Sequence, residues 1–105
     1  DTQFTIYNKD QYYDWHVDQD LDPYQQGVYK GLTRKISLSV SLNDESKYEA
    51  GDFKFGYNNR ETVCKELKQK GTVVVFPSFI HHKVEPVKKG VRYSMVKWFL
   101  GKSFK

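Results

Sequence analysis

The feature that most constrains the fold is the strict alternation of apolar and polar residues over residues 35–42. Four apolar residues alternate there with one lysine and three serines, in the order Lys35-Ile36-Ser37-Leu38-Ser39-Val40-Ser41-Leu42. Because successive side chains of a β-strand point to opposite faces, this period of two predicts a strand with one apolar face. The chain is therefore expected to contain a β-sheet.

Several other short segments have the composition of strands, because they are rich in β-branched and aromatic residues and are bounded by turn-forming residues. They are Phe4–Tyr7, Tyr12–Val17, Asp52–Phe55, Thr72–Phe76, Lys83–Val87 and Val91–Leu100. One further segment, Arg60–Lys70, allows a short helical turn, with apolar residues only at Val63, Cys64 and Leu67. Six or seven short strands at this spacing favour an all-β sandwich or barrel of the jelly-roll type, with at most one short helix.

The size and composition of the chain limit its organisation. With 105 residues it is predicted to form a single domain over residues 1–105. No apolar run approaches the roughly 20 residues of a membrane-spanning helix, so no membrane partner is expected. Cys64 is the only cysteine, which excludes an intrachain disulfide and a multi-cysteine metal site and favours a reducing, cytoplasmic compartment. The chain begins with Asp1, so a removed N-terminal signal would leave no trace in the sequence.

The formal net charge of +4 conceals two unlike halves. Residues 1–50 contain nine acidic and five basic residues, a net charge of −4, and residues 51–105 contain four acidic and twelve basic residues, a net charge of +8. The lysines of the second half are spread out, which is typical of a solvated surface, so nucleic acid is not the expected partner. In the first half, Asp14, Asp18, Asp20 and Asp22 surround His16, and oxygen ligands beside an imidazole indicate a cation site.

The histidines carry the clearest chemical pattern. His16 and Asp18 are two residues apart, and on an extended strand residues at this spacing project from the same face, so their side chains can meet one ion. A distant histidine would complete a set of two histidines and one carboxylate, which leaves half of an octahedral iron open for a bidentate cosubstrate and dioxygen. His81 and His82 both qualify, but their side chains point to opposite faces, so only one of them can bind. Since an isolated His-x-Asp pair is more often a surface ion pair, the assignment needs further matches.

Arg92 supplies such a match ten residues after His82. Strand alternation places its side chain on the same face as those of Ser94, Val96 and Trp98. A guanidinium binds a carboxylate through two parallel hydrogen bonds, and the hydroxyl of Ser94 adds a third donor. This arrangement suits the distal carboxylate of a dicarboxylate cosubstrate.

Four motifs together span nearly the whole chain. They are Tyr7-x5-Tyr13-x2-His16-x-Asp18, Gly71-x4-Phe76-Pro77, His82-x-Val84-x-Pro86-Val87 and Gly90-Val91-Arg92-x-Ser94-x3-Trp98. In this combination the chain resembles the Fe(II)/2-oxoglutarate-dependent dioxygenases, and within them the prolyl 4-hydroxylase-like branch. The resemblance implies that the jelly roll is a double-stranded β-helix.

The resemblance also implies a ligand set and a cosubstrate site. The implied iron ligands are His16, Asp18 and His82, with no catalytic residue beyond them, and the spacing to Val84 and Pro86 favours His82 over His81. The implied cosubstrate-binding residues are Arg92, Ser94, Tyr7, Val84 and Trp98. Among these, Arg92 would bind the C5 carboxylate of 2-oxoglutarate.

The implied activity is the hydroxylation of an unactivated C–H bond, coupled to the conversion of 2-oxoglutarate and O2 to succinate and CO2. Fe(II) would be the cofactor and 2-oxoglutarate the cosubstrate, with ascorbate a candidate reductant. The implied substrate is a prolyl residue of a peptide or protein, bound near Trp15 and Tyr57. The sequence makes no prediction of the oligomeric state.

Two other functions stay open at this point. A cupin-like barrel that binds a metal or a sugar without oxidation would share the strands and the metal ligands, but it would not need Arg92 and Ser94. A nucleic-acid demethylase of the same chemistry generally has a second arginine six residues after the first, where this chain has Trp98.

The chain departs from the family pattern at three positions. Asp10 stands where glycine is usual, Ser41 stands in the place of a tyrosine, and Ala50 replaces the first residue of a Gly-Gly pair. The helices and strands that usually precede the iron motif are missing from this sequence, so we expect it to be either a fragment that holds the catalytic core or a minimal member of the family.

Overall fold

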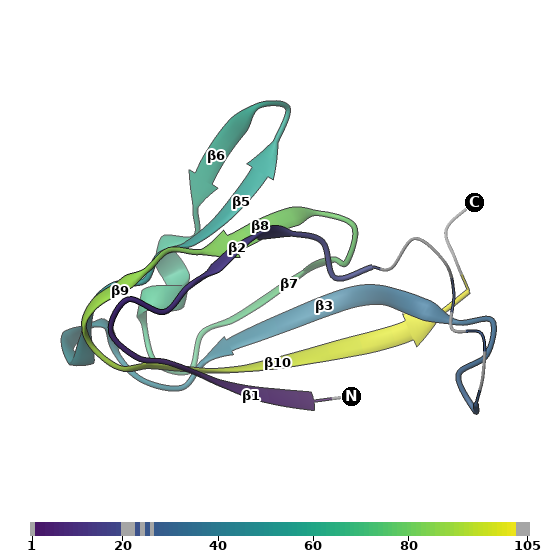
Figure 1. The fold of residues 1–105 in the computed structure, drawn as a ribbon, viewed down its shortest axis with the longest axis horizontal. Coiled ribbons are helices and arrows are strands. Elements are labelled where there is room, and N and C mark those ends of the chain that lie inside the picture. Colours follow the sequence, from purple (N-terminus) through teal and green to yellow (C-terminus); the bar gives the residue numbers. More distant parts are fainter. Residues whose placement is uncertain (1, 20–22, 24, 26, 103–105) are drawn as a thin grey trace.

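The computed structural model describes residues 2–19, 23, 25 and 27–102, which form an almost entirely β structure (Figure 1). Asp20 and Asp22, which the sequence places near His16, lie outside the described residues. The strands are β1 Thr2–Tyr7, β2 Tyr13–His16, β3 Thr33–Ser41, β4 Tyr48–Ala50, β5 Phe53–Tyr57, β6 Arg60–Val63, β7 Val73–Pro77, β8 His81–Val84, β9 Val87–Gly90 and β10 Arg92–Gly101. Two short 3-10 turns, η1 Glu45–Lys47 and η2 Lys65–Lys68, complete the elements.

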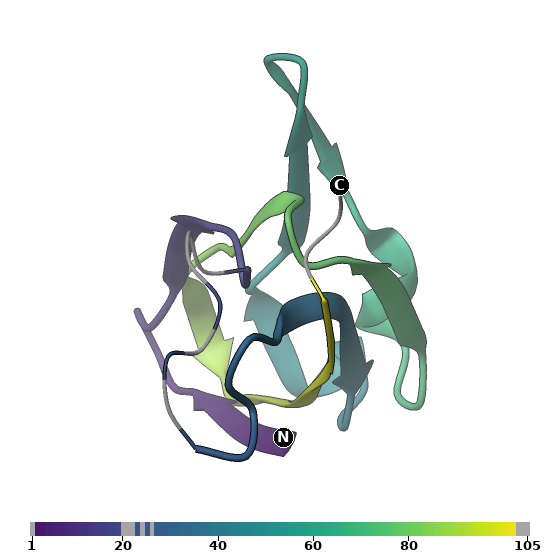
Figure 2. The ribbon, with the colours of Figure 1, turned by 90° about the vertical axis from the view of Figure 1, so that its right-hand side faces the viewer.

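The strands form two facing antiparallel sheets and a small third one. The first sheet has the order β1-β10-β3-β7, the second has the order β2-β8-β5-β6, and β4 pairs with β9. Figure 2 shows the two larger sheets facing each other, with the β5–β6 hairpin rising from the second sheet. This arrangement confirms the prediction of an all-β jelly roll, the double-stranded β-helix.

The predicted helical turn over Arg60–Lys70 is wrong. Its first residues form β6, which pairs with β5, and only Lys65–Lys68 makes a single 3-10 turn. The reason lies in the two residues between the strands, because Asn58 and Asn59 both adopt left-handed backbone conformations, with φ of 50° and 62°. Asparagine tolerates this conformation, and two such residues in succession make the tight turn of a β-hairpin.

The predicted strand over Lys83–Val87 is also wrong in its extent. It divides into β8, which ends at Val84, and β9, which begins at Val87. Pro86 lies between them and has no N–H to donate to a sheet, so the chain leaves one sheet and enters another there. The short strand β4 has no counterpart among the predicted strands.

The first sheet is polar on its inner face and apolar on its outer face. The serines of β3 face inward and are buried, whereas the apolar residues that alternate with them lie on the outer face and are only half-buried. On the same outer face Phe4 of β1 remains 71% exposed. The inner face of this sheet is therefore suited to line a polar site between the sheets.

A compact apolar cluster lies beside this polar interior. It contains eight buried residues: Tyr7, Tyr48, Phe53, Cys64, Leu67, Phe76, Val84 and Val87. Burial raises the pKa of the Cys64 thiol, which agrees with the expectation that this cysteine packs as a small apolar residue. Among the described residues, no helix is long and apolar enough to cross a membrane.

Candidate metal centre and its cavity

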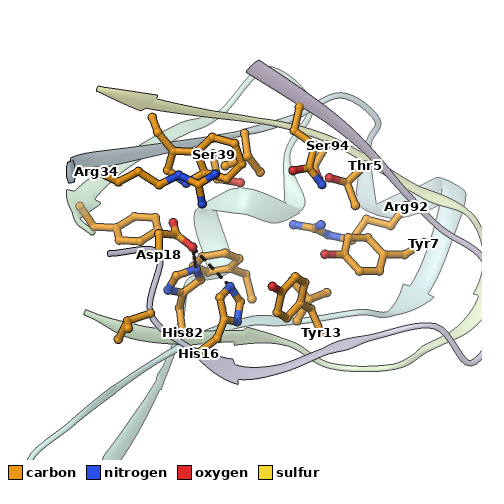
Figure 3. Close-up of a pocket in the computed structure, with 17 residues that line it drawn as sticks. Thr5, Tyr7, Tyr13, His16, Asp18, Arg34, Ser39, His82, Arg92 and Ser94 are labelled. Atoms are coloured by element: carbon orange, nitrogen blue, oxygen red, sulfur yellow. Dashed lines mark ion pairs between the residues drawn. The ribbon is translucent and has the colours of Figure 1, made fainter. Parts of the chain in front are cut away.

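A cavity of about 270 Å³ lies between the two larger sheets, and Figure 3 shows the side chains around it. All eight residues that the sequence assigns to the metal or to the cosubstrate line this cavity: His16, Asp18, His82, Arg92, Ser94, Tyr7, Val84 and Trp98. They come from β1, β2, β8, β10 and the segment that follows β2. The fold therefore brings together residues that are as far as 91 positions apart in the sequence.

Two histidines and one carboxylate meet at one end of the cavity. His16 and His82 lie opposite each other on the paired strands β2 and β8, with ring centroids 4.2 Å apart. The Nε2 atoms of His16 and His82 lie 3.4 Å and 3.3 Å from Oδ1 of Asp18. All three ligand atoms lie within 4.8 Å of one another, which is close enough to share one metal ion.

The hydrogen bonds of the two imidazoles fit metal binding. Nδ1 of His16 lies 2.7 Å from the carbonyl oxygen of Asp14, and Nδ1 of His82 lies 2.9 Å from the carbonyl oxygen of Ile80. Because a carbonyl oxygen only accepts, each Nδ1 carries a proton and donates it. Each Nε2 faces Oδ1 of Asp18, where a shared metal ion can take the place of an Nε2 proton.

Asp18 is held as an anion although it is only 8% exposed. Burial alone would raise its pKa, but hydrogen bonds with His16, His82 and Ser37 outweigh burial and hold the pKa of this carboxyl far below its usual range. The hydroxyl of Ser37 donates to Oδ2 at 2.6 Å. The carboxylate is therefore ready to coordinate a cation without first losing a proton.

The structure separates the two adjacent histidines that the residues alone leave as alternatives. His82 is buried and faces Asp18, whereas His81 is exposed and pairs with Gly56 at the start of β8. Only His82 lies within reach of the other two ligands.

Arg92 lies at the opposite end of the cavity from the histidines (Figure 3). It is only 2% exposed, and among the described residues it makes no ion pair with a carboxylate. Its guanidinium lies 5.6 Å from the centre of the Tyr7 ring. Burial raises the pKa of the Tyr7 hydroxyl, and the charge of Arg92 acts in the opposite direction. A buried cation without an acidic partner is costly, so this end of the cavity is suited to an anionic ligand.

A family model for the 2OG-Fe(II) oxygenase superfamily matches residues 2–100. The chain belongs to this superfamily. Curated relatives include a PKHD-type hydroxylase of Synechococcus sp. (strain CC9605), 36% identical over 87 residues that cover 82% of this chain and 35% of the relative. Another, from Alteromonas mediterranea, is 30% identical over 99 residues, which cover 90% of this chain and 41% of the relative. The chain thus spans well under half the length of these oxygenases.

Solved structures give the same fold. A prolyl-4-hydroxylase from Pseudomonas putida aligns with a TM-score of 0.70 and 24% sequence identity, covering 93% of this chain and 50% of that one. A viral collagen prolyl hydroxylase from Paramecium Bursaria Chlorella virus-1, in complex with 2OG, aligns with a TM-score of 0.64 and 21% identity, covering 99% and 62%. At these identities the likeness supports the jelly-roll fold of the oxygenase.

The 2OG-Fe(II) oxygenase family uses Fe(II) and 2-oxoglutarate, and the residues of the cavity fit both. The donor set of two imidazole nitrogens and one carboxylate oxygen is the set that non-haem Fe(II) takes in oxygenases. Arg92, which has no acidic partner among the described residues, lies across the cavity from that set, as a dicarboxylate that spans the cavity requires.

At two departures from the family pattern the backbone is in the left-handed conformation. Asp10 and Ala50, which stand where this oxygenase family usually has glycine, adopt left-handed conformations with φ of 70° and 65°. Aspartate tolerates this conformation better than most residues, because its short polar side chain can hydrogen-bond locally. Ala50 lacks a side chain that can hydrogen-bond locally, so it is strained there.

Arg34, Ser39 and Tyr13, which line the cavity, were not predicted as site residues from the sequence, and neither was Ser37, which donates a hydrogen bond to Asp18. The Tyr13 ring stacks on His16 at 3.8 Å, and the guanidinium of Arg34 lies 3.8 Å from the centre of the Trp98 ring. The alternation in β3 already places both serines on one face. Arg34 could not be placed in this way, because a bulge at Lys35 reverses the alternation, and Arg34 pairs with Leu100 on the inner side.

Trp15 and Tyr57, the predicted substrate contacts, do not line the cavity. They line a separate open hollow of about 450 Å³ beside the β5–β6 hairpin, together with His81 and Glu61. The Trp15 ring packs over Gly56, where an added Cβ would lie 3.0 Å from it. Since His16 follows Trp15 and points inward, the Trp15 side chain lies on the outer face of the second sheet.

Proposed function

We propose that this chain is the catalytic core of a 2-oxoglutarate-dependent dioxygenase, forming one domain over residues 1–105. The observation that carries the proposal is that one cavity has the His16, Asp18 and His82 cluster at one end and the buried Arg92, with no acidic partner in the described part of the chain, at the other. A metal and a dicarboxylate bound together occupy both ends, and neither ligand alone accounts for them.

Each residue has a stated task in this proposal. Nε2 of His16, Oδ1 of Asp18 and Nε2 of His82 would hold Fe(II) at the end of the cavity, which would leave room there for other ligands. Arg92 binds the distal carboxylate of 2-oxoglutarate through paired hydrogen bonds, and the buried hydroxyl of Ser94 adds a donor beside it. Tyr7, Val84 and Trp98 line the walls between the two ends.

Bound Fe(II) supplies the redox chemistry by which O2 converts 2-oxoglutarate to succinate and CO2 and hydroxylates a C–H bond. The protein orients the reactants and restricts water. Phe53 and Phe76 pack against the His82 ring, with centroids at 5.5 Å and 4.8 Å, and they shield that side of the ligand set. No protein group has to transfer a proton or form a covalent bond with the substrate in this scheme.

The proposed substrate is a prolyl residue of a peptide or protein. The names of similar proteins, which include a prolyl-4-hydroxylase and a collagen prolyl hydroxylase, support this class. The hollow lined by Trp15 and Tyr57 lies on the element that carries His16 and on the adjacent hairpin, where it would contact a chain that extends out of the cavity. The lone, buried Cys64 supports the further proposal of a reducing, cytoplasmic compartment.

The two alternative functions differ in whether they explain Arg92 at the end of the cavity opposite the histidines. A cupin-like metal barrel does not require the buried charge of Arg92. A nucleic-acid demethylase of the same chemistry is not favoured, because the inner-face position six residues after Arg92 carries Trp98, whose ring is covered by Arg34 from another strand.

An anaerobic spectroscopic titration tests the proposal. Adding 2-oxoglutarate to the Fe(II)-loaded chain should produce a weak visible charge-transfer band, and admitting O2 should release succinate slowly even without a substrate. Iron that stays bound without such a band would instead support the cupin-like barrel. A mass-spectrometric screen of proline-containing peptides for the gain of one oxygen atom then tests the substrate class, and a gain only on proline-free control peptides would contradict it.

A further inference from the structure

Asp18 contacts the two histidines through only one of its carboxylate oxygens. Oδ1 faces both Nε2 atoms, whereas Oδ2 accepts the hydrogen bond from the Ser37 hydroxyl at 2.6 Å. Ser37 is in turn 2.8 Å from the hydroxyl of Ser78. Both serines are completely buried, with 0% exposure, so water does not compete for these bonds.

The Asp18 carboxylate at the end of this chain determines which hydroxyl donates in each hydrogen bond. An ionised carboxylate only accepts, so Ser37 donates its single hydroxyl proton to Asp18. The proton between the two serines then belongs to Ser78, which donates to Ser37. Each bond polarises the next, and the bond to the carboxylate is charge-assisted, which makes it stronger than a bond between neutral groups.

Backbone hydrogen bonds join Asp18 to Ser78, and Ser78 to the strand that carries Ser37. The carbonyl oxygen of Ser78 accepts hydrogen bonds from the N–H groups of Asp18 at 2.9 Å and Gln19 at 3.0 Å. The N–H of Ser78 donates to the carbonyl oxygen of Lys35 at 2.8 Å. The segment after β2, the segment after β7 and strand β3 are thus joined around Asp18, and its carboxylate has little freedom to rotate.

We propose that Ser37, supported by Ser78, is a positioning residue that keeps Asp18 a one-oxygen ligand of the metal and so preserves the open positions needed by the cosubstrate. This inference rests on the proposed function. A carboxylate can bind a metal through one oxygen or through two. With three protein ligand atoms, an octahedral ion retains three positions, two for a chelating cosubstrate and one for dioxygen. If Oδ2 also bound the metal, one of these positions would be lost.

The hydrogen bond from Ser37 opposes that loss. For Oδ2 to turn to the metal, the carboxylate would have to break a buried, charge-assisted bond and leave the Ser37 hydroxyl without an acceptor. The proposal therefore predicts an effect that differs from general loss of structure. Without the Ser37 hydroxyl, Oδ2 of Asp18 would be able to turn to the metal. The metal should then stay bound, because the added oxygen ligand offsets the looser orientation of the carboxylate. The cosubstrate should bind less well, because one of its positions is taken.

The test compares Ser37→Ala with Ser41→Ala in the otherwise intact chain. Ser41 is the matched control, because it lies on the same strand and the same face, is equally buried, and its hydroxyl donates to the Asn43 carbonyl at 2.9 Å, away from the cavity. Co(II) affinity and 2-oxoglutarate affinity of the Co(II)-loaded protein are measured by titration, together with the visible Co(II) spectrum, which reports coordination number.

For Ser37→Ala we expect Co(II) affinity within about 3-fold of wild type, a changed Co(II) spectrum and 2-oxoglutarate affinity lower by about 10-fold or more, within the range typical of partners that orient metal ligands. Ser37→Thr, which keeps the hydroxyl, should restore both the spectrum and the affinity. If Ser37→Ala does not fold, Ser78→Ala replaces it, with a smaller weakening of 2-oxoglutarate binding expected.

Unchanged 2-oxoglutarate affinity in the folded serine variant would overturn the inference, and so would a parallel loss of Co(II) and 2-oxoglutarate affinity. Both results leave the proposed function intact. Failure of the wild-type chain to bind a divalent metal at all would instead refute the proposed function itself, so the two failures are distinguishable.

Discussion

At one end of the cavity Asp18 is a buried anion surrounded by hydrogen-bond donors, and at the other end Arg92 is a buried cation with no acidic partner among the described residues. The first charge is stabilised by the protein itself, through two histidines and the Ser37 hydroxyl. The second charge is left for a ligand to neutralise. Under the proposed function, the metal end is preorganised, whereas the arginine end is completed by an anion that enters the cavity.

We expect the largest effect from a substitution that removes Asp18 from the metal end of the cavity. Asp18→Ala removes the oxygen that both histidines face, so metal affinity should fall by more than about 100-fold, beyond the typical cost of losing only a supporting partner. Binding of 2-oxoglutarate should fall to its metal-free level. Titration with Fe(II) under anaerobic conditions measures the first effect. Asp14→Ala, which removes an exposed carboxylate from the neighbouring strand β2, is the control, and equal losses in the two variants would contradict the assignment.

Arg92→Ala removes the guanidinium from the opposite end of the cavity and leaves the three proposed metal ligands in place. The account predicts that metal affinity stays within about 3-fold of wild type, whereas 2-oxoglutarate affinity falls by about 100-fold, because two charge-assisted hydrogen bonds are lost. Isothermal titration calorimetry gives both values, the metal affinity from the metal-free variant and the 2-oxoglutarate affinity from the metal-loaded variant. Lys97→Ala removes the same charge from the opposite, exposed face of β10 and should bind like wild type. Normal cosubstrate binding by Arg92→Ala would refute the role of this arginine.

Gly51→Ala perturbs the arginine end indirectly. An added Cβ would lie 2.9 Å from Val87 Cγ2 and 3.5 Å from Arg92 Cδ, at a residue with φ of 66°. The unfolding free energy should fall by about 2 kcal/mol, with a Tm decrease of roughly 10 °C, and 2-oxoglutarate should bind less tightly while the metal affinity is unchanged. Gly71→Ala has the same backbone strain but nothing within 4 Å of its added Cβ, so it should leave the affinity intact.

The smallest expected effect is an increase in stability that leaves both ends unaltered. Ala50 is strained at φ 65°, and Ala50→Gly relieves that strain at the cost of a more flexible unfolded chain. The net gain should be about 0.5–1 kcal/mol, which thermal unfolding would register as a Tm increase of roughly 4 °C. A lower Tm for this variant would show that the left-handed conformation at Ala50 is not a source of strain.

The ligand cluster was the part of the site most open to prediction from sequence. The His16-x-Asp18 spacing identified both ligands, although Asp18 lies just after β2 and is held there by a backbone hydrogen bond to Ser78, and Arg92 lies on a long strand with a regular period of two. Cavity residues from β3 were harder to find. The alternation there predicts the strand, but it does not reveal that the serines face inward, because the usual rule buries the apolar face and this interior has to hold a charged ligand set.

Other elements depend on local backbone geometry that a residue pattern does not report. The inward position of Arg34 follows from the bulge at Lys35, and the β5–β6 hairpin follows from the two left-handed asparagines, in a segment whose spacing also allowed a helical turn. The distance between Trp15 and the cavity follows from the same strand alternation that places His16 inside it, so that separation could have been deduced from the sequence.

The central claim is that the two ends of the cavity bind one ligand together, and the most direct test is the affinity for 2-oxoglutarate with and without Fe(II), measured anaerobically by isothermal titration. If one molecule contacts both the metal and Arg92, the metal should tighten 2-oxoglutarate binding by at least about 10-fold, and 2-oxoglutarate should tighten metal binding by the same factor. Equal affinities with and without the metal would contradict the claim, because the metal and Arg92 would then belong to independent sites.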